Sequence, residues 1–245
     1  MNRWGEKRYH SMDYDLKQLY GEKVYKITLN GGMTCPNRDG KIGHGGCIFC
    51  STAGSGDFAG PATCSITKQL AMGKENLTKK RPVHSYIAYF QAFTNTYAPV
   101  EYLRQIYMEA IQDPDVQILS IATRPDCLPD DVLQLLEEIN QIKPVWVELG
   151  LQTIHPQTAN YIRRGYPLEV FEEAVNNLRK RNISVITHTI LGLPGENEDM
   201  MLETIDYLNK MDIQGIKLQL LHILKGTDLA LDYEKQPFWS PSMEE

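Results

Sequence analysis

Three cysteines stand close together in a glycine-rich stretch near the N-terminus, at Cys35, Cys47 and Cys50. Six of the 21 residues from 30 to 50 are glycine, which frees the backbone to bring thiols to a common point. Thiolates that converge repel one another unless a metal neutralises their charge. The chain has five cysteines, an odd number that suits metal chemistry in a reducing compartment better than a disulfide framework.

Two kinds of metal centre fit these cysteines. Cys35, Cys47 and Cys50 with His44 as a fourth ligand form a zinc set. An iron–sulfur cluster held by the three cysteines alone leaves one iron open to a cofactor or substrate. Structural zinc usually stabilises a small module, whereas this loop follows the first predicted strand of a chain large enough to fold unaided, which favours the cluster. The structural alternative is a flexible loop with reduced cysteines.

The remaining cysteines, Cys64 and Cys127, are too few for a second cluster. We expect both to be small buried or partly exposed residues. Cys127 follows the third predicted strand, beside Arg124 and Asp126, and is the better placed of the two for a role in a site.

The elements that must position the cysteines form a regular alternation. Six runs rich in Val, Ile, Thr and aromatic residues alternate with five stretches of helical spacing, at intervals of roughly 30 residues, which is typical of βα units. Six such units favour an α/β fold of the partial-barrel type over a doubly wound sheet, the alternative, and ligands gather at the C-terminal ends of the strands. The predicted strands are 24–29, 85–91, 116–123, 144–152, 183–191 and 215–224, and the predicted helices are 66–80, 99–112, 130–142, 157–181 and 198–210.

Composition excludes several classes of protein. The chain has 245 residues, 42% of them hydrophobic and 23% charged, as in ordinary globular proteins and unlike disordered or collagenous ones. Its net charge of -6 argues against a broad nucleic-acid footprint. No apolar run approaches the roughly 18 to 20 residues of a bilayer helix, and the start MNRWGEKRYHSMDYDLK has no signal-peptide core. We therefore expect a cytoplasmic protein with no membrane partner.

Several motifs resemble those of one family. The Cys35-x11-Cys47-x2-Cys50 loop, with Phe49 before its last cysteine, and LGLPGE at 191–196 resemble the radical S-adenosylmethionine (SAM) superfamily. The long first gap is typical of relatives of the elongator catalytic subunit. The segments YFQAFTNTYAP, IATRPDC, ELGLQT and LLHILKGT are similar to the YtqA/YhcC group of that superfamily. The resemblance covers about residues 21–227 and implies a partial (βα)6 radical SAM barrel, in agreement with the strand pattern.

The resemblance also implies a domain organisation and a chemistry. It implies a single radical SAM core domain over residues 1–245; relatives of the group continue beyond the position of Glu245, so the chain is either a shorter member or lacks a C-terminal extension. In this superfamily three cysteines, here Cys35, Cys47 and Cys50, hold a [4Fe–4S] cluster whose fourth iron is chelated by SAM. An electron from a donor such as flavodoxin or ferredoxin splits SAM, and the 5′-deoxyadenosyl radical takes a hydrogen atom from the substrate.

Five further residues are implied to bind SAM. Gln91 stands where relatives carry a glycine-rich element that meets the methionine amino group. Glu148 and Gln152 share one face of the fourth strand by its period of two. In coproporphyrinogen-oxidase-like relatives a glutamine at the place of Gln152 meets the cofactor, and an arginine at the place of Arg164 binds the methionine carboxylate through its charged fork. His188 replaces an acidic residue that bonds the ribose, and its imidazole can still hydrogen-bond a hydroxyl.

These residues have structural alternatives. Glu148 and Gln152 could be a buried polar pair, although burying a carboxylate that has no function costs free energy. Arg163 and Arg164 could be solvated helix charges. The basic runs at 79–81, 163–164 and 179–181 are candidates for local RNA contact or for solvated faces.

The resemblance to the YtqA-like group implies a substrate as well. It implies tRNA wobble-uridine modification, in which the carboxymethyl arm of 5-carboxymethylaminomethyluridine is removed to leave an aminomethyl group. Two alternatives remain at this point: a radical SAM enzyme that acts on a small molecule or protein, and a zinc-stabilised scaffold that binds RNA or a partner protein.

Overall fold

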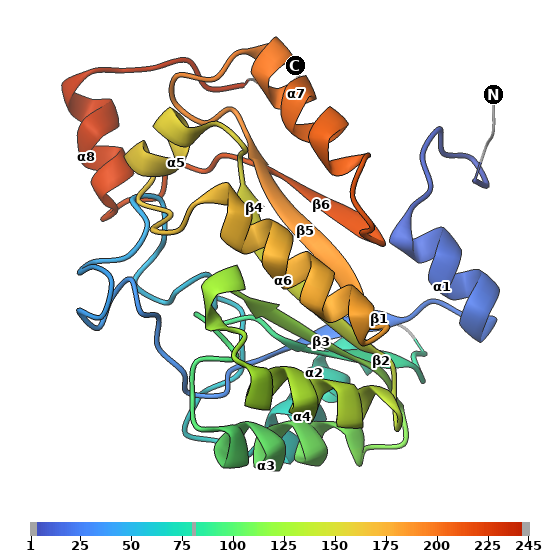
Figure 1. The fold of residues 1–245 in the computed structure, drawn as a ribbon. Helices are drawn as coiled ribbons and strands as arrows, with labels where there is room; N and C mark the ends of the chain where they lie inside the picture. The colour runs from blue at the N-terminus through green and yellow to red at the C-terminus, as the bar shows by residue number, and fades with distance from the viewer. Residues whose placement is uncertain (1–3, 80–81, 242–245) are drawn as a thin grey trace.

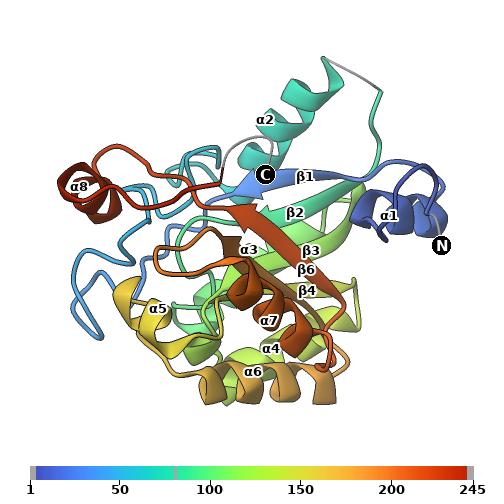
Figure 2. The ribbon, with the colours of Figure 1, turned by 90° about the horizontal axis from the view of Figure 1, so that it is seen from above.

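A computed structural model describes residues 4–79 and 82–241 and contains a six-stranded parallel sheet in the order β1-β2-β3-β4-β5-β6. The sheet is strongly curled, and its helices lie along the outer side (Figures 1 and 2). This confirms the expected partial (βα)6 barrel. The strands are β1 (Tyr25–Leu29), β2 (Tyr86–Phe90), β3 (Val116–Thr123), β4 (Val145–Gln152), β5 (Ser184–Leu191) and β6 (Gly215–Leu220).

Most connecting helices also agree with the sequence pattern. The outer helices are α2 (Ile66–Thr78), α3 (Val100–Ile111), α4 (Asp130–Asn140), α6 (Leu168–Lys180) and α7 (Glu198–Leu208). Helix α2 was predicted to extend to residue 80, which lies outside the described residues. The sequence pattern missed α1 (Met12–Tyr20), α8 (Asp228–Lys235) and a single 3-10 turn at Pro125–Cys127.

One predicted helix is wrong. The stretch 157–181 forms two helices, α5 (Pro156–Tyr161) and α6, rather than one. Between them Arg163 and Gly165 adopt the left-handed conformation with φ of 57° and 81°, and Pro167 precedes the first residue of α6. A left-handed residue and a proline both interrupt an α-helix, so the chain turns sharply at this point.

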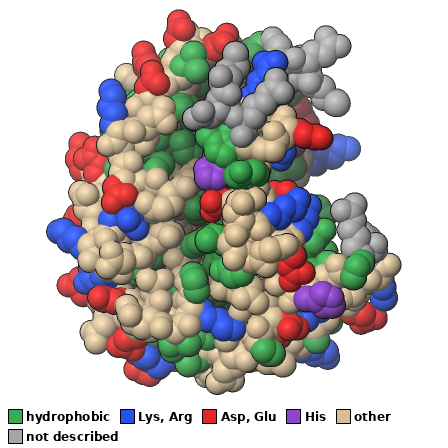
Figure 3. Space-filling model, turned by 90° about the vertical axis from the view of Figure 1, so that its right-hand side faces the viewer, with side chains coloured by type: hydrophobic (Ala, Val, Ile, Leu, Met, Phe, Trp, Pro, Cys, Tyr) green, Lys and Arg blue, Asp and Glu red, His purple; other side chains and the backbone are tan. Residues whose placement is uncertain are grey.

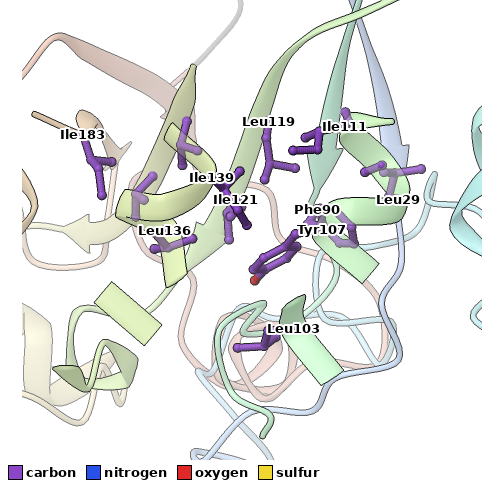
Figure 4. Packing of buried hydrophobic residues seen from close by; sticks show 14 of the residues in the cluster. Leu29, Phe90, Leu103, Tyr107, Ile111, Leu119, Ile121, Leu136, Ile139 and Ile183 are labelled. Atoms are coloured by element: carbon purple, nitrogen blue, oxygen red, sulfur yellow. The ribbon is translucent and has the colours of Figure 1, made fainter. Parts of the chain in front are cut away.

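The main apolar core lies between the outer face of the sheet and the helices that cover it. Phe90 of β2 packs edge-to-face on Tyr107 of α3, with ring centroids 5.1 Å apart, and both side chains are fully buried (Figure 4). Leu119 and Ile121 of β3 and Leu136 of α4 belong to the same cluster. Burial of each such side chain stabilises the fold by about 1.5 to 3 kcal/mol. Since the core lies outside the sheet, the concave inner face is available for polar residues.

Helix α1 closes the N-terminal end of the barrel. Its N-cap Ser11 accepts a hydrogen bond from the backbone of Tyr14, and Gly21 ends it with φ of 74°. Leu16 packs into a small cluster with Ile87 of β2 and Ile118 of β3. Apolar side chains therefore line this end of the barrel. No helix of the described residues is long and apolar enough to cross a bilayer.

Candidate active site

A cavity of about 260 Å³ lies on the inner side of the sheet, toward the C-terminal ends of the strands. Every residue that the family resemblance implies as a cluster ligand or SAM contact lines it. Those residues are Cys35, Cys47, Cys50, Gln91, Glu148, Gln152, Arg164 and His188. The fold thus gathers side chains from five separate segments of the chain around one space.

The cysteine loop reaches the cavity through a glycine turn. Gly45 and Gly46, directly before Cys47, have φ of 84° and 86°, a conformation that L side chains rarely adopt. A Cβ on Gly46 would lie 2.8 Å from Nε of Arg38. The Arg38 guanidinium donates from Nη2 to the carbonyl oxygen of Cys50 at 3.2 Å. Glycine at position 46 therefore leaves room for the Arg38 side chain, which links the first part of the loop to Cys50 at its end.

Apolar packing fixes the same loop from behind. Ile48, between two of the cysteines, is 3% exposed and belongs to an apolar cluster with Ile162, Leu193 and Leu229. The backbone N–H of Ile48 donates to Ile162 at 3.3 Å, and its carbonyl accepts from Leu229 of α8 at 3.0 Å. The two segments that the sequence pattern did not resolve, the break after α5 and helix α8, thus hold the cysteines in position.

The three thiols act on one another electrostatically. The pKa of Cys47 is raised to about 11, by burial first and then by the nearby Cys50 and Cys35, which together outweigh the lowering by Arg124 and by an Asn37 amide 3.6 Å from Sγ. A thiol in this setting becomes a thiolate when positive iron neutralises the group, as ligation to a cluster does. The donor set therefore fits an iron–sulfur cluster.

The zinc alternative lacks its proposed fourth ligand in this arrangement. In the described part of the chain, no three His, Cys, Asp or Glu side chains converge at the spacing of a single metal ion. A four-iron cluster is larger than an ion and holds its cysteines farther apart. His44, the proposed fourth zinc ligand, is absent from the cavity wall, and its ring packs against Gly40, where an added Cβ would lie 2.7 Å from Cε1.

Gln152 presents an unsatisfied acceptor to the cavity. It lies at a register shift between β4 and β5, with φ of 69°. Its Oε1 is buried and has no hydrogen-bond partner among the described residues. A Cβ on Gly150 would lie 2.9 Å from Nε2 of Gln152, so glycine makes room for this amide. A buried acceptor without a donor is costly, and a bound ligand with an N–H or O–H group would satisfy it.

Arg164 is buried rather than solvated, which corrects the alternative of a surface helix charge. It is 3% exposed, its Nη1 donates to the carbonyl oxygens of Leu151 at 3.1 Å and Thr153 at 2.6 Å, and its Nε donates to Tyr166 at 3.0 Å. No hydrogen bond among the described residues uses Nη2. Burial lowers the pKa of Arg164, but a guanidinium remains charged. The Nη2 group of the guanidinium is therefore available to bind an anion.

Glu148 and His188 bind each other deep in the barrel. His188 Nε2 lies 2.7 Å from Glu148 Oε2, and Ser120 donates to Oε1. Lys26 also donates to Oε1, and Lys217 Nζ lies 3.8 Å from Oε2. Burial raises the pKa of Glu148, but the His188 hydrogen bond and the charges of Lys26 and Lys217 outweigh it and hold the pKa well below its ordinary value. The carboxylate therefore stays ionised.

Sequence reasoning missed both lysines. Lys26 and Lys217 each interrupt a predicted strand that is otherwise rich in apolar residues. A lysine in the middle of such a strand is the signal that could have identified them, because lysine is almost never buried without a partner.

The basic runs do not form exposed cationic patches where they are described. Arg163 pairs with Asp228, Arg179 pairs with Asp212 at 2.9 Å, and Arg181 lies 3.4 Å from Glu137. Lys80 and Arg81 lie outside the described residues. On the face drawn in Figure 3, basic and acidic side chains are interspersed.

The two remaining cysteines are separate from this cavity. Cys127 is buried and lines a second cavity next to α6, where burial and the neighbouring Asp126 raise its pKa. Cys64 is partly exposed and lies in the loop before α2.

Comparison with known proteins agrees with this geometry. Residues 37–208 match the family model of the Radical SAM superfamily. YtqA of Bacillus subtilis (strain 168) is 53% identical over 230 residues, which are 94% of this chain and 71% of that protein. YhcC of Escherichia coli (strain K12) is 44% identical over 221 residues, 90% of this chain and 70% of that protein.

More distant proteins share part of the sequence or the fold. The tRNA-2-methylthio-N(6)-dimethylallyladenosine synthase of Fusobacterium nucleatum is 27% identical over 118 residues, 47% of this chain and 27% of that protein. The solved structure of Elp3 from the archaeon Methanocaldococcus infernus superposes with a TM-score of 0.65 at 16% identity over 89% of this chain. This chain spans 50% of that structure, and the likeness concerns the fold. The family match and the two close relatives together show that the chain belongs to the radical SAM superfamily, whose enzymes use a [4Fe–4S] cluster and SAM.

Proposed function

We propose that this radical SAM enzyme modifies the wobble uridine of tRNA by removing the carboxymethyl arm of 5-carboxymethylaminomethyluridine to leave 5-aminomethyluridine. The observation that carries the proposal is the single cavity that joins three cysteine thiols to a buried polar interior. A relative named as a tRNA-modifying synthase supports tRNA as the substrate class.

The residues of the cavity divide into two groups in this proposal. Cys35, Cys47 and Cys50 hold the cluster. Gln91, Gln152 and Arg164 contact SAM, because Gln152 has a buried acceptor without a partner and Arg164 has a guanidinium arm outside its backbone contacts. When bound, the cluster and SAM supply a 5′-deoxyadenosyl radical that takes a hydrogen atom from the substrate.

Glu148 and His188, which the sequence analysis also expected to contact SAM, have a different role in this proposal. They line the same cavity, but they hydrogen-bond each other, and Glu148 also accepts from Lys26 and lies 3.8 Å from Lys217 Nζ. We assign them to the inner wall of the site, where they limit how deeply SAM and the substrate enter. The apolar cluster around Leu16 lies below this wall and keeps water out of the barrel floor.

The proposed partners follow from the chemistry. Radical SAM enzymes need a reductant, for which we propose flavodoxin or ferredoxin. The net charge of -6 and the interspersed charges of Figure 3 favour a small RNA contact, in which the modified nucleoside enters the cavity and most of the tRNA stays outside.

The test is anaerobic turnover on defined tRNA. The protein is reconstituted with iron and sulfide, reduced with dithionite, and given SAM with tRNA that carries 5-carboxymethylaminomethyluridine or unmodified uridine at the wobble position. We expect 5′-deoxyadenosine to increase with the modified tRNA alone and the nucleoside digest to contain 5-aminomethyluridine by mass spectrometry. Formation of 5′-deoxyadenosine with no change in either tRNA would reject the tRNA substrate and point to a small molecule or protein.

A further inference from the structure

The inner face of the barrel carries a set of polar side chains to which every strand contributes one residue. We call this set the polar layer: Lys26, Tyr89, Ser120, Glu148, His188 and Lys217. Tyr89 is in register with Ser120 across β2 and β3, and His188 is in register with Lys217 across β5 and β6. Glu148 contacts four members of the layer, which makes its carboxylate the centre of the set.

The charges of the polar layer do not balance. Lys26 and Lys217 bring two ammonium groups, and Glu148 brings one carboxylate. Burial lowers the pKa of His188, and Lys217 and Lys26 lower it further, although Glu148 raises it, so the imidazole is neutral at neutral pH. Tyr89 is neutral as well, because burial and Glu148 raise its pKa. One positive charge of the layer is left without a counter-charge, which is unfavourable inside a barrel.

The two lysines differ in how fully they are engaged. Lys26 donates to Glu148 Oε1 and its Nζ lies 4.2 Å from the centroid of the Tyr89 ring. Lys217 has only long contacts among the described residues: its Nζ is 3.3 Å from the Tyr89 hydroxyl and 3.8 Å from Glu148 Oε2. Its side chain is 34% exposed and lines the cavity that the three cysteines share. An ammonium has three donors, so Lys217 has capacity for a further acceptor.

The position of Lys217 restricts what that acceptor is. It lies midway along β6, beside His188, whereas the cysteines lie on a loop beyond the strands. A backbone phosphate of an RNA that stays outside the barrel does not reach this depth. A carboxylate on a short flexible arm does, and it would supply the missing negative charge.

We propose that Lys217, assisted by the Tyr89 hydroxyl, binds a carboxylate of the substrate inside the barrel. This rests on the proposed function, because it assigns the residue that recognises the carboxymethyl arm. Lys217 donates an N–H to the carboxylate, and the Tyr89 hydroxyl, which accepts from Lys217 Nζ at 3.3 Å, holds the ammonium in place. Lys217 is then the residue that selects the carboxylated substrate over an uncharged one.

The first experiment measures charge selectivity in binding. Anticodon stem-loop RNAs that carry 5-carboxymethylaminomethyluridine, its neutral carboxamide or unmodified uridine are titrated into the reconstituted protein with SAM present and no reductant. We expect wild type to bind the acid about tenfold more tightly than the amide, as for one charge-assisted hydrogen bond. Lys217→Met should remove this preference, Lys217→Arg should keep it, and Lys225→Met, at an exposed lysine, should leave it unchanged.

Binding of SAM is measured for the same variants, because SAM carries a carboxylate of its own. We expect the Kd for SAM to change less than about twofold in Lys217→Met, since a lost charge-assisted hydrogen bond would change it about tenfold. A large loss of SAM affinity with an unchanged preference between acid and amide would overturn the proposal. An equal preference in wild type and Lys217→Met would overturn it as well.

A second experiment separates this proposal from the tRNA proposal. Lysines are labelled as carbon-13 dimethyl-lysine, Lys217 is assigned by the resonance missing in Lys217→Arg, and acetate is titrated while the spectrum is followed. We expect the Lys217 resonance to shift with acetate more than that of Lys225. This result together with no binding of any RNA would reject the tRNA substrate and retain the carboxylate site. A Lys217 resonance that does not respond to acetate would reject the carboxylate site whatever the RNA result.

Discussion

His188 Nε2 lies 2.7 Å from Oε2 of Glu148 on the neighbouring strand, so the fold buries an imidazole against an ionised carboxylate. Lys26, Tyr89 and Lys217 surround the pair from β1, β2 and β6. A carboxylate only accepts hydrogen bonds, so the ring donates from Nε2. Two ammonium groups next to the ring disfavour a second proton on it. The pair therefore depends on a neutral histidine.

This relationship predicts a pH dependence of stability. The pKa of His188 in the folded protein is lowered from 6.5, mainly by burial, so the unfolded chain takes up the proton more readily. The stabilisation is present above the unfolded pKa and declines as the pH falls below it. We expect the free energy of unfolding to decrease between about pH 7 and about pH 5.5 and the decrease to be smaller in His188→Gln, which keeps a donor for Glu148. Urea unfolding at several pH values measures this, and identical slopes in the two proteins would contradict it.

Removing the carboxylate should destabilise the fold. Glu148→Gln leaves Lys26 and Lys217 inside the barrel without a counter-charge, and loss of one partner of a buried ion pair costs about 3 kcal/mol. The double variant Lys26→Met/Glu148→Gln removes one of the two ammonium groups and should recover part of the loss. Urea unfolding at neutral pH measures both. A Glu148→Gln variant as stable as wild type would mean that water solvates the lysines.

Substitution of the three proposed cluster ligands should separate the cysteines into two classes. Cys35→Ala, Cys47→Ala and Cys50→Ala should each lose the bound iron and the visible absorbance after anaerobic reconstitution, because three thiolates are needed to hold the cluster. Cys64→Ala and Cys127→Ala are the controls and should keep both, since neither residue lines the cavity. Iron and sulfide analysis of the five variants decides the matter. Loss of iron in a control would assign that cysteine to the cluster.

The unpartnered amide of Gln152 predicts a change in SAM affinity. Gln152→Ala removes one hydrogen bond to the bound ligand and should raise the Kd for SAM about three- to tenfold. Gly150→Ala should act in the same direction, because its methyl group would lie 2.9 Å from Nε2 of Gln152 and only at ordinary contact distances, 3.8 and 3.9 Å, from the Tyr166 hydroxyl and the Thr123 carbonyl oxygen. Equilibrium binding of SAM to the reconstituted proteins measures both. An unchanged Kd in both variants would place the SAM contacts elsewhere in the cavity.

The glycine before Cys47 predicts a loop-specific defect. Gly46→Ala combines a left-handed backbone, which costs about 1 to 2 kcal/mol for an L residue, with a contact against Arg38. Gly195→Ala has a similar φ of 87° but open space around it, so it is a matched control for backbone strain. We expect both variants to lose stability and only Gly46→Ala to lose iron. Equal iron contents would show that the loop adapts to a side chain.

The predicted strands and the cysteine ligands follow from local patterns. Alternation of apolar strands with amphipathic helices depends on residues that are neighbours in sequence, so five of the six strands end within one residue of the prediction. Cys35, Cys47 and Cys50 lie within one short loop, and their thiol chemistry depends on residue type and spacing. The residues expected to meet SAM were named from family motifs, and their roles remain predictions that the experiments above test.

Only the tertiary structure decided which side chains meet. Lys26 and Glu148 are 122 residues apart in the sequence, and no local pattern reports that two strands place them at one depth of a curled sheet. From the sequence, Arg164 could likewise be a solvated charge on a helix. In the structure, the break after α5 places it against β4, where it is buried. The sequence by itself determined the strands, most of the outer helices and the chemical groups, because these depend on local preference. The tertiary structure determined the charge balance inside the barrel. That balance depends on charged side chains from several strands, which come together only in the folded chain.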